Sequence, residues 1–299
     1  MRERQPAWLK QQIPPAGAMA PVDGLLRDLR LNTVCEGARC PNIGRCFASG
    51  TATFMIMGKN CTRNCTFCAV EKCPPSPLEA DEPQRVVEAV RRLGLSYVVI
   101  TSVTRDDLAD GGAGHFVRTV QLLRQSPGVR VEVLIPDFKG DAGALTAVVE
   151  AIPDVLAHNL ETVPRLYAEV RPQAVYRRSL ELLGRVKQID PSMLTKSGIM
   201  LGLGETAEEI RQVMTDLRGE GCDLLTLGQY LPPSRQHHEL VRYVTPDEFA
   251  GYEVLGMEMG FRGVASAPLV RSSFRAGELY AAALEGAARW PKHAGENQI

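Results

Sequence analysis

Residues 50–68 read GTATFMIMGKNCTRNCTFC and contain the pattern from which the architecture of the whole chain follows. Residues 51–57 are β-branched or apolar and are bounded by Gly50 and Gly58, which is typical of a short buried strand. A cysteine-rich loop follows immediately. Enzymes built on parallel sheets take their chemical groups from loops at the carboxyl ends of the strands. The segment therefore predicts the first strand of a parallel sheet, with a chemical site directly after it.

The rest of the chain alternates between short apolar runs and segments with helical spacing. Six strands, each followed by a helix, imply parallel pairing with right-handed crossovers. Because six such units are too few for a closed eight-stranded barrel, we predict an α/β fold with a partial (β/α)6 TIM-like barrel. A doubly wound open sheet is the alternative. The predicted strands are 51–57, 97–101, 129–135, 155–160, 197–202 and 224–231, and the predicted helices are 83–93, 114–125, 142–151, 175–189, 206–219 and 246–259.

Two extensions flank the predicted barrel, which we place at residues 51–262. Residues 1–50 form an N-terminal extension with some helix near Arg27, and we expect its first part to wrap around the barrel as a lid or arm. Residues 263–299 form a C-terminal extension that ends in a polar tail over 285–299.

The charge balance argues against a nucleic-acid-binding or membrane-binding surface. The chain has 34 basic and 35 acidic residues and a formal net charge of -1. No stretch approaches the ~20 apolar residues of a membrane span, and the N-terminus lacks the apolar run of a signal peptide. We therefore expect a cytoplasmic protein, in which thiols stay reduced. The eight cysteines then need a role other than disulfide formation, and six of them lie between Cys35 and Cys68.

The first cysteine array consists of Cys61, Cys65 and Cys68, in the pattern C-x3-C-x2-C. Such tight spacing allows one loop to wrap around a single cubane cluster with three thiolates. Three ligands leave one iron of a four-iron cluster open to a small molecule. The alternative is a zinc site, but structural zinc usually takes two separated pairs of ligands in a closed shell.

A second array, Cys35, Cys40 and Cys46, lies upstream of the barrel in the pattern C-x4-C-x5-C. Its spacing also suits a cluster, and again a fourth ligand is missing. The alternative is a zinc knuckle completed by a distant residue. Since zinc normally takes Cys or His as its fourth ligand and no His lies nearby, we favour a second, separate cluster.

The first array after a first barrel strand resembles the radical S-adenosylmethionine superfamily. The resemblance implies that the amino and carboxylate groups of S-adenosylmethionine chelate the open iron, and that reductive cleavage yields a 5′-deoxyadenosyl radical. Phe67 matches an aromatic residue that often lies between the last two cysteines. It is expected to pack near the adenine or to take part in ordinary loop packing.

The two arrays together resemble the lipoyl synthase family, and the resemblance extends over residues 8–276. It implies that Cys35, Cys40 and Cys46 hold an auxiliary 4Fe-4S cluster whose fourth ligand is Ser273, in the segment Arg271-Ser-Ser-Phe-Arg-Ala276. Phe274 stands where the family usually has a tyrosine. A weakly held oxygen ligand suits a cluster that gives up its sulfur, because iron–sulfur clusters prefer thiolate.

The same resemblance implies the reaction and the partners. Two sulfur atoms are inserted at carbons 6 and 8 of an octanoyl chain, which is attached to a lysine of a lipoyl carrier protein. The auxiliary cluster is the sulfur donor, and each insertion uses one S-adenosylmethionine. The implied partners are octanoylated lipoyl domains of 2-oxoacid dehydrogenase subunits or the glycine-cleavage H protein, an electron donor such as flavodoxin or ferredoxin, and a carrier that reloads the auxiliary cluster.

Candidate contacts to S-adenosylmethionine lie at the carboxyl ends of the later strands. Asn159 and Glu161 could take the ribose hydroxyls and the methionine amino group, and the Arg171 guanidinium could pair with the methionine carboxylate. Ser102 closes the second strand and Lys196 marks the fifth. The alternatives are ordinary ones: Asn159 and Glu161 could cap a helix, and Arg171 could form a surface ion pair.

Other polar or thiol side chains are expected to be structural. The acidic run before Gly111 and Gly112 lacks an EF-hand pattern, and a solvated or capping loop explains it better than a metal site. We expect neither metal-ligand nor catalytic roles for Asp106, Asp107, Asp110, His237, His238, Cys73 and Cys222.

Three other classes of protein fit the sequence less well. A biotin-synthase-like or methylthio-transferring radical enzyme carries a different second-cluster pattern. A ferredoxin-like electron carrier needs neither a barrel-sized chain nor an open iron. A zinc-stabilised binding module would contain no iron.

Overall fold

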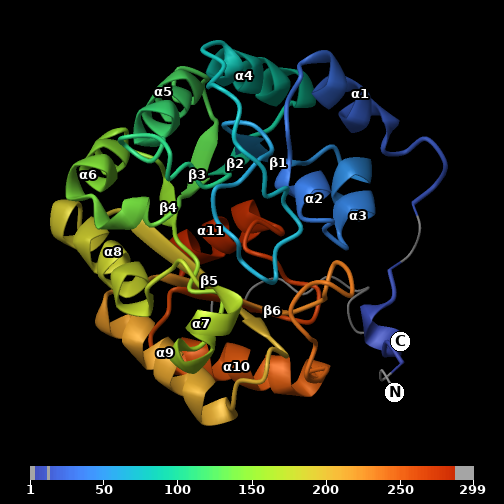
Figure 1. Cartoon of the computed structure of the whole chain (residues 1–299), viewed down its shortest axis with the longest axis vertical. Coiled ribbons are helices and arrows are strands. Elements are labelled where there is room, and N and C mark those ends of the chain that lie inside the picture. Colours follow the sequence, from blue (N-terminus) through green and yellow to red (C-terminus); the bar gives the residue numbers. More distant parts are fainter. Residues whose placement is uncertain (1–3, 12–13, 287–299) are drawn as a thin grey trace.

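The sheet of the protein consists of seven parallel strands in the order β1-β2-β3-β4-β5-β6-β7. The structure is a computed structural model that describes residues 4–11 and 14–286, so most of the predicted polar tail lies outside the described residues. Figure 1 shows the strands surrounded by helices on their outer side. The strands are β1 Thr53–Ile56, β2 Tyr97–Ser102, β3 Arg130–Leu134, β4 Val155–Ala157, β5 Leu194–Leu201, β6 Leu224–Gln229 and β7 Gly263–Ser266.

Helices connect successive strands, which confirms the predicted partial barrel. A doubly wound sheet would reverse its strand order at one point, whereas here every strand pairs with its sequence neighbour. No helix in the described part of the chain has the length and apolar character needed to cross a membrane. The outer helices are α4 Glu82–Leu93, α5 Ala113–Leu123, α6 Ala142–Glu150, α8 Tyr176–Ile189, α9 Ala207–Gly219 and α10 Pro246–Glu258, and the short helices between strands are η2 Phe138–Gly140, η3 Pro164–Leu166 and α7 Tyr167–Val170.

The seventh strand, β7, was not predicted from the sequence. It pairs with β6 over Gly263–Ser266 and is buried along its whole length. It has only four residues and begins with a glycine, so it lacks the bulky β-branched run that marks a strand. The glycine is required by packing: a Cβ at Gly263 would lie 2.9 Å from the Leu279 side chain.

The N-terminal extension lies beside β1 at the open edge of the sheet (Figure 1). Thr33 forms an antiparallel bridge with Phe54, and the Met55 N–H donates to the Asn32 carbonyl at 2.8 Å. These bonds satisfy backbone groups that an edge strand would otherwise expose. The extension contains η1 Ala7–Leu9, α1 Ala20–Asp28, α2 Val34–Gly37 and α3 Ile43–Ala48, and α1 confirms the helix predicted near Arg27.

The last described helix, α11 (Ala276–Glu285), crosses the amino ends of the strands. Its Tyr280 ring lies 5.5 Å from the ring of Tyr97, the first residue of β2. Its apolar side packs in one cluster with the first residues of β4, β5 and β6, which are Val155, Leu194 and Leu224. The C-terminal helix therefore closes the amino-terminal end of the barrel.

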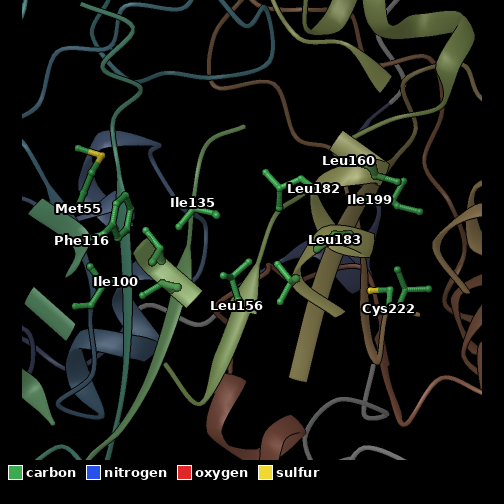
Figure 2. Packing of buried hydrophobic residues seen from close by; sticks show 14 of the residues in the cluster. Met55, Ile100, Phe116, Ile135, Leu156, Leu160, Leu182, Leu183, Ile199 and Cys222 are labelled. Carbon is green, nitrogen blue, oxygen red and sulfur yellow. The ribbon is translucent and has the colours of Figure 1, made fainter. Parts of the chain in front are cut away.

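The two faces of the sheet differ in polarity. The outer face carries the main apolar core against the helices, where Figure 2 shows Ile100, Leu156 and Ile199 among helix residues such as Phe116 and Leu183. The inner face carries a buried ion pair instead. Lys196 on β5 donates to Glu132 on β3 at 2.8 Å, and the Tyr97 hydroxyl donates to the same carboxylate at 2.7 Å.

We expect Lys196→Met to lower the free energy of unfolding by about 3–5 kcal/mol, because it leaves the buried Glu132 carboxylate without its counter-charge. The double variant Lys196→Met with Glu132→Leu should lose much less, since apolar replacements of a buried pair are often neutral. Urea unfolding followed by circular dichroism measures both. Arg177→Ala, which removes an exposed ion pair with Glu181, is the matched control and should cost less than about 1 kcal/mol. Equal losses in the single and double variants would contradict the expectation.

Candidate functional site

The first cysteine array lies in the loop after β1, where the sequence places it. Burial raises the pKa of Cys65 and raises that of Cys68 to about 12, and the neighbouring thiols of the array add to both shifts. All three cysteines of the array are partly buried. The backbone N–H groups of Arg63 and Thr104 point at the Cys61 sulfur, at 3.4 and 3.3 Å. Such hydrogen bonds stabilise cluster-bound sulfur and help to set its reduction potential.

Arg63 anchors this loop from within. Its side chain is buried and forms a bidentate pair with Asp106, with distances of 2.8 and 3.0 Å. It also donates to Asp137 at 2.5 Å, and the second oxygen of Asp137 accepts from Arg178 on α8 at 3.2 Å. Burial alone would raise the pKa of Asp137, but the hydrogen bonds and charge of Arg63 hold it at about 2. The loop is thereby tied to the loops after β2 and β3.

Further hydrogen bonds attach the loop on its other sides. The Thr62 hydroxyl donates to the Thr104 carbonyl, and the Thr66 hydroxyl donates to the Glu169 carbonyl, each at 2.9 Å. The His238 backbone N–H donates to the Thr66 carbonyl at 2.9 Å. The cysteine loop is thus held by segments that follow several different strands, as a preorganised site requires.

The second array lies on the N-terminal extension. Cys35 lies on α2, Cys46 lies on α3, and Cys40 lies in the turn between these helices. Burial raises the pKa of Cys35 to about 11 and that of Cys46 to about 12, with contributions from the other thiols of the array. Beside them, the buried Asn42 amide donates to the Leu269 carbonyl at 2.7 Å. This bond connects the array to the far end of the chain.

The strap, residues 267–275, links the second array to the strand ends. Its Ser272 hydroxyl accepts from the Asn159 amide at 2.7 Å. Two residues later, the Phe274 ring lies under the Arg45 guanidinium, 5.4 Å from ring centroid to Cζ, and packs in the same apolar cluster as Cys46. Ser273 therefore sits between a residue bonded to Asn159 and a residue packed beside the second array.

Asn159, Glu161 and Arg171 come together at the carboxyl end of β4. The Asn159 amide donates to Glu161 at 3.0 Å, and Arg171 donates to the carbonyls of Asn159 and Leu160 at 2.9 and 3.0 Å. The carbonyl of the preceding residue, Val170, accepts from the Thr66 N–H at 3.0 Å, which places Arg171 next to the cysteine loop, and its positive charge opposes the rise that burial causes in the pKa of Cys65. Arg171 is buried and bonded to backbone, so the surface ion-pair alternative is wrong.

Glu161 adopts an unusual backbone conformation, with φ of 65°. Its N–H donates to the Gly198 carbonyl at 2.9 Å, and its carbonyl accepts from the Met200 N–H at 2.8 Å. Burial raises the pKa of its carboxyl, and the Arg171 charge opposes the rise. A non-glycine residue held in this region is typical of functional sites. The helices that follow are capped by Val163 and Leu166, so the capping alternative for Asn159 and Glu161 is wrong.

Four polar atoms of this region are buried without a hydrogen-bond partner among the described residues: Ser102 Oγ, Asn159 Oδ1, Thr162 Oγ1 and Arg171 Nε. Buried polar atoms are rarely left unpaired unless a ligand or water completes them. A ligand with amino, carboxylate and hydroxyl groups, such as S-adenosylmethionine, has the complementary chemistry. The donor set of the candidate site therefore fits this group.

Two other candidate residues lie elsewhere. Lys196 points into the barrel interior, where it pairs with Glu132, and Phe67 is partly buried against the main core. The contacts of Phe67 and Lys196 with S-adenosylmethionine stay predictions.

The acidic residues before Gly111 and Gly112 fit the expected solvated or capping loop only in part, because Asp110 makes capping contacts whereas Asp106 lies in an ion pair with the buried Arg63. Asp106 pairs with Arg63, Asp107 pairs with Arg105, and Asp110 accepts from the N–H groups of Gly112 and Gly114. Cys222 is buried in the main core, and Cys73 is exposed.

Arg63, Arg271 and Ser272 were not predicted. Burial lowers the pKa of Arg271, while the charges of Cys40 and Glu161 oppose the shift, and its guanidinium donates to the Val270 carbonyl at 2.6 Å. Arg63 lies between two cysteines of the first array, and Arg271 and Ser272 precede Ser273. Proximity to those residues was the available signal.

Comparison with known proteins defines the class first. Residues 55–217 match the profile of the Radical SAM superfamily. Two solved structures share the fold. Methylornithine synthase (PylB) has a TM-score of 0.51 and 15% identity, with 87% of each chain covered. Streptococcus suis SuiB bound to S-adenosylmethionine has a TM-score of 0.56 and 12% identity, with 83% of this chain and 60% of that chain covered. The fold and the first cysteine loop are those of a radical S-adenosylmethionine protein, whose cofactors are a 4Fe-4S cluster and S-adenosylmethionine.

The sequence relatives narrow the class further. Residues 1–40 match the N-terminal domain of lipoyl synthase of the Radical SAM family. Lipoyl synthase of Caldanaerobacter subterraneus subsp. tengcongensis is 59% identical over 276 residues, which cover 92% of this chain and 97% of that protein. Lipoyl synthase of Rubrobacter xylanophilus is 54% identical over 287 residues, which cover 96% of this chain and 89% of that protein. The chain belongs to the lipoyl synthase family.

We expect Arg63→Met to release iron from the first array, because the loop loses both carboxylate anchors. Iron per chain after anaerobic purification should fall from about eight toward about four, since each cubane holds four. Arg63→Lys should lose less, as it keeps the charge but not the bidentate geometry. Arg177→Met, at an exposed arginine, is the control. Unchanged iron in Arg63→Met would show that the anchors do not hold the array.

The low pKa of Asp137 predicts a pH dependence. The pKa of the Asp137 carboxyl is about 2 in the folded protein and about 3.9 in the unfolded chain. The carboxylate therefore stabilises the protein fully at pH values above about 3.9, and this stabilisation is lost as the pH falls through 2. At neutral pH, the free energy of unfolding of the metal-free wild type should exceed that of Asp137→Asn by about 2–3 kcal/mol. Urea unfolding between pH 7 and 2 should show this difference narrowing below about pH 4. A pH-independent difference would contradict the assignment.

Proposed function

We propose that this chain is a lipoyl synthase that inserts two sulfur atoms at carbons 6 and 8 of an octanoyl chain, which is attached to a lysine of a lipoyl carrier protein. The observation that carries the proposal is the strap. It is bonded to Asn42 beside one cysteine array and to Asn159 at the strand ends beside the other. Radical generation and sulfur donation on one alkyl chain require two such sites next to each other.

Cys61, Cys65 and Cys68 would hold the cluster that binds S-adenosylmethionine. When bound and reduced there, this pair supplies a 5′-deoxyadenosyl radical that removes hydrogen from an unactivated carbon. Arg63 keeps the loop in place through Asp106 and Asp137. The protein's contribution is to orient the reactants and to exclude water.

The groups at the strand ends would hold S-adenosylmethionine itself. Asn159 presents an unpaired amide oxygen, and Ser102 presents an unpaired hydroxyl. Arg171 supplies a buried positive charge suited to the methionine carboxylate. Glu161 supplies a carboxylate suited to the amino group or to a ribose hydroxyl. Phe67 and Lys196 complete the proposed set, Phe67 by packing near the adenine and Lys196 from the barrel interior.

Cys35, Cys40 and Cys46, with Ser273, would hold the auxiliary cluster, which is a substrate because it gives up its sulfur. Ser273 follows Ser272 on the strap and precedes Phe274, which packs in the cluster beside Cys46. Iron–sulfur clusters prefer thiolate, so an oxygen ligand is the one that leaves most easily. The position of Ser273 therefore suits a replaceable ligand.

The proposal extends to partners and place in the cell. The octanoyl chain would arrive on lipoyl domains of 2-oxoacid dehydrogenase subunits or on the glycine-cleavage H protein. Flavodoxin or ferredoxin would supply electrons, and a cluster carrier would reload the auxiliary site. Eight free cysteines suit the reducing cytoplasm. The division at residues 50 and 262 into extension, barrel and extension is part of the same proposal.

An octanoyl-lysine peptide assay with S-adenosylmethionine and reductant tests the proposal. Wild type should bind about eight irons, two cubanes of four, and form lipoyl product. Cys35→Ala should bind about four, still release 5′-deoxyadenosine and form no lipoyl product. Cys61→Ala should release no 5′-deoxyadenosine. Cys73→Ala, at an exposed cysteine outside both arrays, is the control. Lipoyl product from Cys35→Ala would remove the sulfur-donor role of that array.

A further inference from the structure

Both amide hydrogens of Asn159 are committed to protein partners. One donates to the Glu161 carboxylate at 3.0 Å, and the other donates to the Ser272 hydroxyl at 2.7 Å. The amide oxygen is buried and has no partner among the described residues. The two donor bonds fix the rotation of the amide, so they determine where this oxygen points. Ser272 thus sets the orientation of a group that the candidate site offers to its ligand.

Gly198 on β5 makes room for this contact. A Cβ at position 198 would lie 2.8 Å from Ser272 Oγ and 2.9 Å from Asn159 Oδ1, closer than real Cβ atoms approach. The end of β4, the middle of β5 and the strap therefore meet at one point. The hydrogen bond is enclosed on its β5 side, which keeps it from being a chance contact of an exposed serine.

The strap also contacts Asn42 and Arg45, which lie beside the cysteines of the second array. Its Leu269 carbonyl accepts from Asn42 at 2.7 Å, and its Phe274 ring lies under Arg45. The Phe274 N–H donates to the Arg271 carbonyl at 2.9 Å, which folds residues 271–274 into a tight turn. Ser272 and Ser273 occupy the centre of this turn. A displacement of Ser273 from the second array therefore moves Ser272 against Asn159.

We propose that Ser272 is a positioning residue that couples the two sites: the strap, when seated on the second array, holds Asn159 ready for S-adenosylmethionine, and bound S-adenosylmethionine holds the strap in place. This inference rests on the proposed function for the identity of the ligand. Coupling of this kind is reciprocal, because each ligand must favour the arrangement that the other favours. Ser273 acts on the auxiliary cluster, whereas Ser272 acts through Asn159.

Hydrogen exchange of the strap is the direct test. We expect S-adenosylmethionine, added without reductant to the two-cluster protein, to slow amide exchange over residues 267–275 in wild type. Ser272→Ala should lose this protection and bind S-adenosylmethionine about three- to tenfold more weakly in equilibrium dialysis, as expected for one neutral hydrogen bond. Ser266→Ala is the matched control and should behave as wild type. Ser266 lies on β7, next to the strap, and its buried hydroxyl donates to the Phe249 carbonyl on α10.

A second comparison separates coupling from a local contact. The triple variant with alanine at Cys35, Cys40 and Cys46 removes the second array, and there Ser272→Ala should weaken binding little further. An equal effect of Ser272→Ala with and without the array would overturn the coupling, as would unchanged strap protection in Ser272→Ala. If the triple variant fails to fold, the exchange result decides alone. Both readouts are independent of lipoyl product, so a protein that shows coupling but makes no product would contradict only the proposed function.

Discussion

The unpaired edges of the parallel sheet are the constraint on which the rest of the molecule depends. Seven strands do not close a barrel, so β1 and β7 each leave one row of backbone groups unpaired within the sheet. The Met55 N–H is satisfied by the Asn32 carbonyl from the N-terminal extension. That pairing places α2 and α3 beside β1, and with them the second cysteine array. The gap in the sheet thus brings the two arrays near each other.

The strap completes this arrangement from the other end of the chain. It leaves β7, reaches Asn42 on the extension and turns back to Asn159, just after the carboxyl end of β4. Segments more than 200 positions apart in the sequence are joined in this way, as the pair Asn42 and Leu269 shows. The connection is made by the Asn42 bond to the Leu269 carbonyl, the Asn159 bond to the Ser272 hydroxyl and the contact of Arg45 with the Phe274 ring, and the two hydrogen bonds give it a defined geometry.

Sequence patterns predicted the barrel well because each strand and helix has a strong local period. The β7 strand was not predicted, because Gly263–Ser266 lacks a local period of this kind and is held in the sheet by packing, in which Gly263 lies against the Leu279 side chain. The cysteines were predictable because their spacing alone indicates a cluster. Arg63 and Ser272 were not, because their partners Asp137 and Asn159 lie 74 and 113 positions away. Lys196 reads as a strand-end residue, yet its side chain faces inward to Glu132.

The position of α11 determines from which sides ligands can reach the interior of the barrel. Because this helix packs against Tyr97, Val155 and Leu194, it closes the amino-terminal end of the barrel, so the interior is approached from the carboxyl ends of the strands or from the side between β1 and β7, where the sheet is not closed. A ligand held at the carboxyl ends of the strands therefore enters and leaves on the side of the barrel that carries the first cysteine array, away from α11.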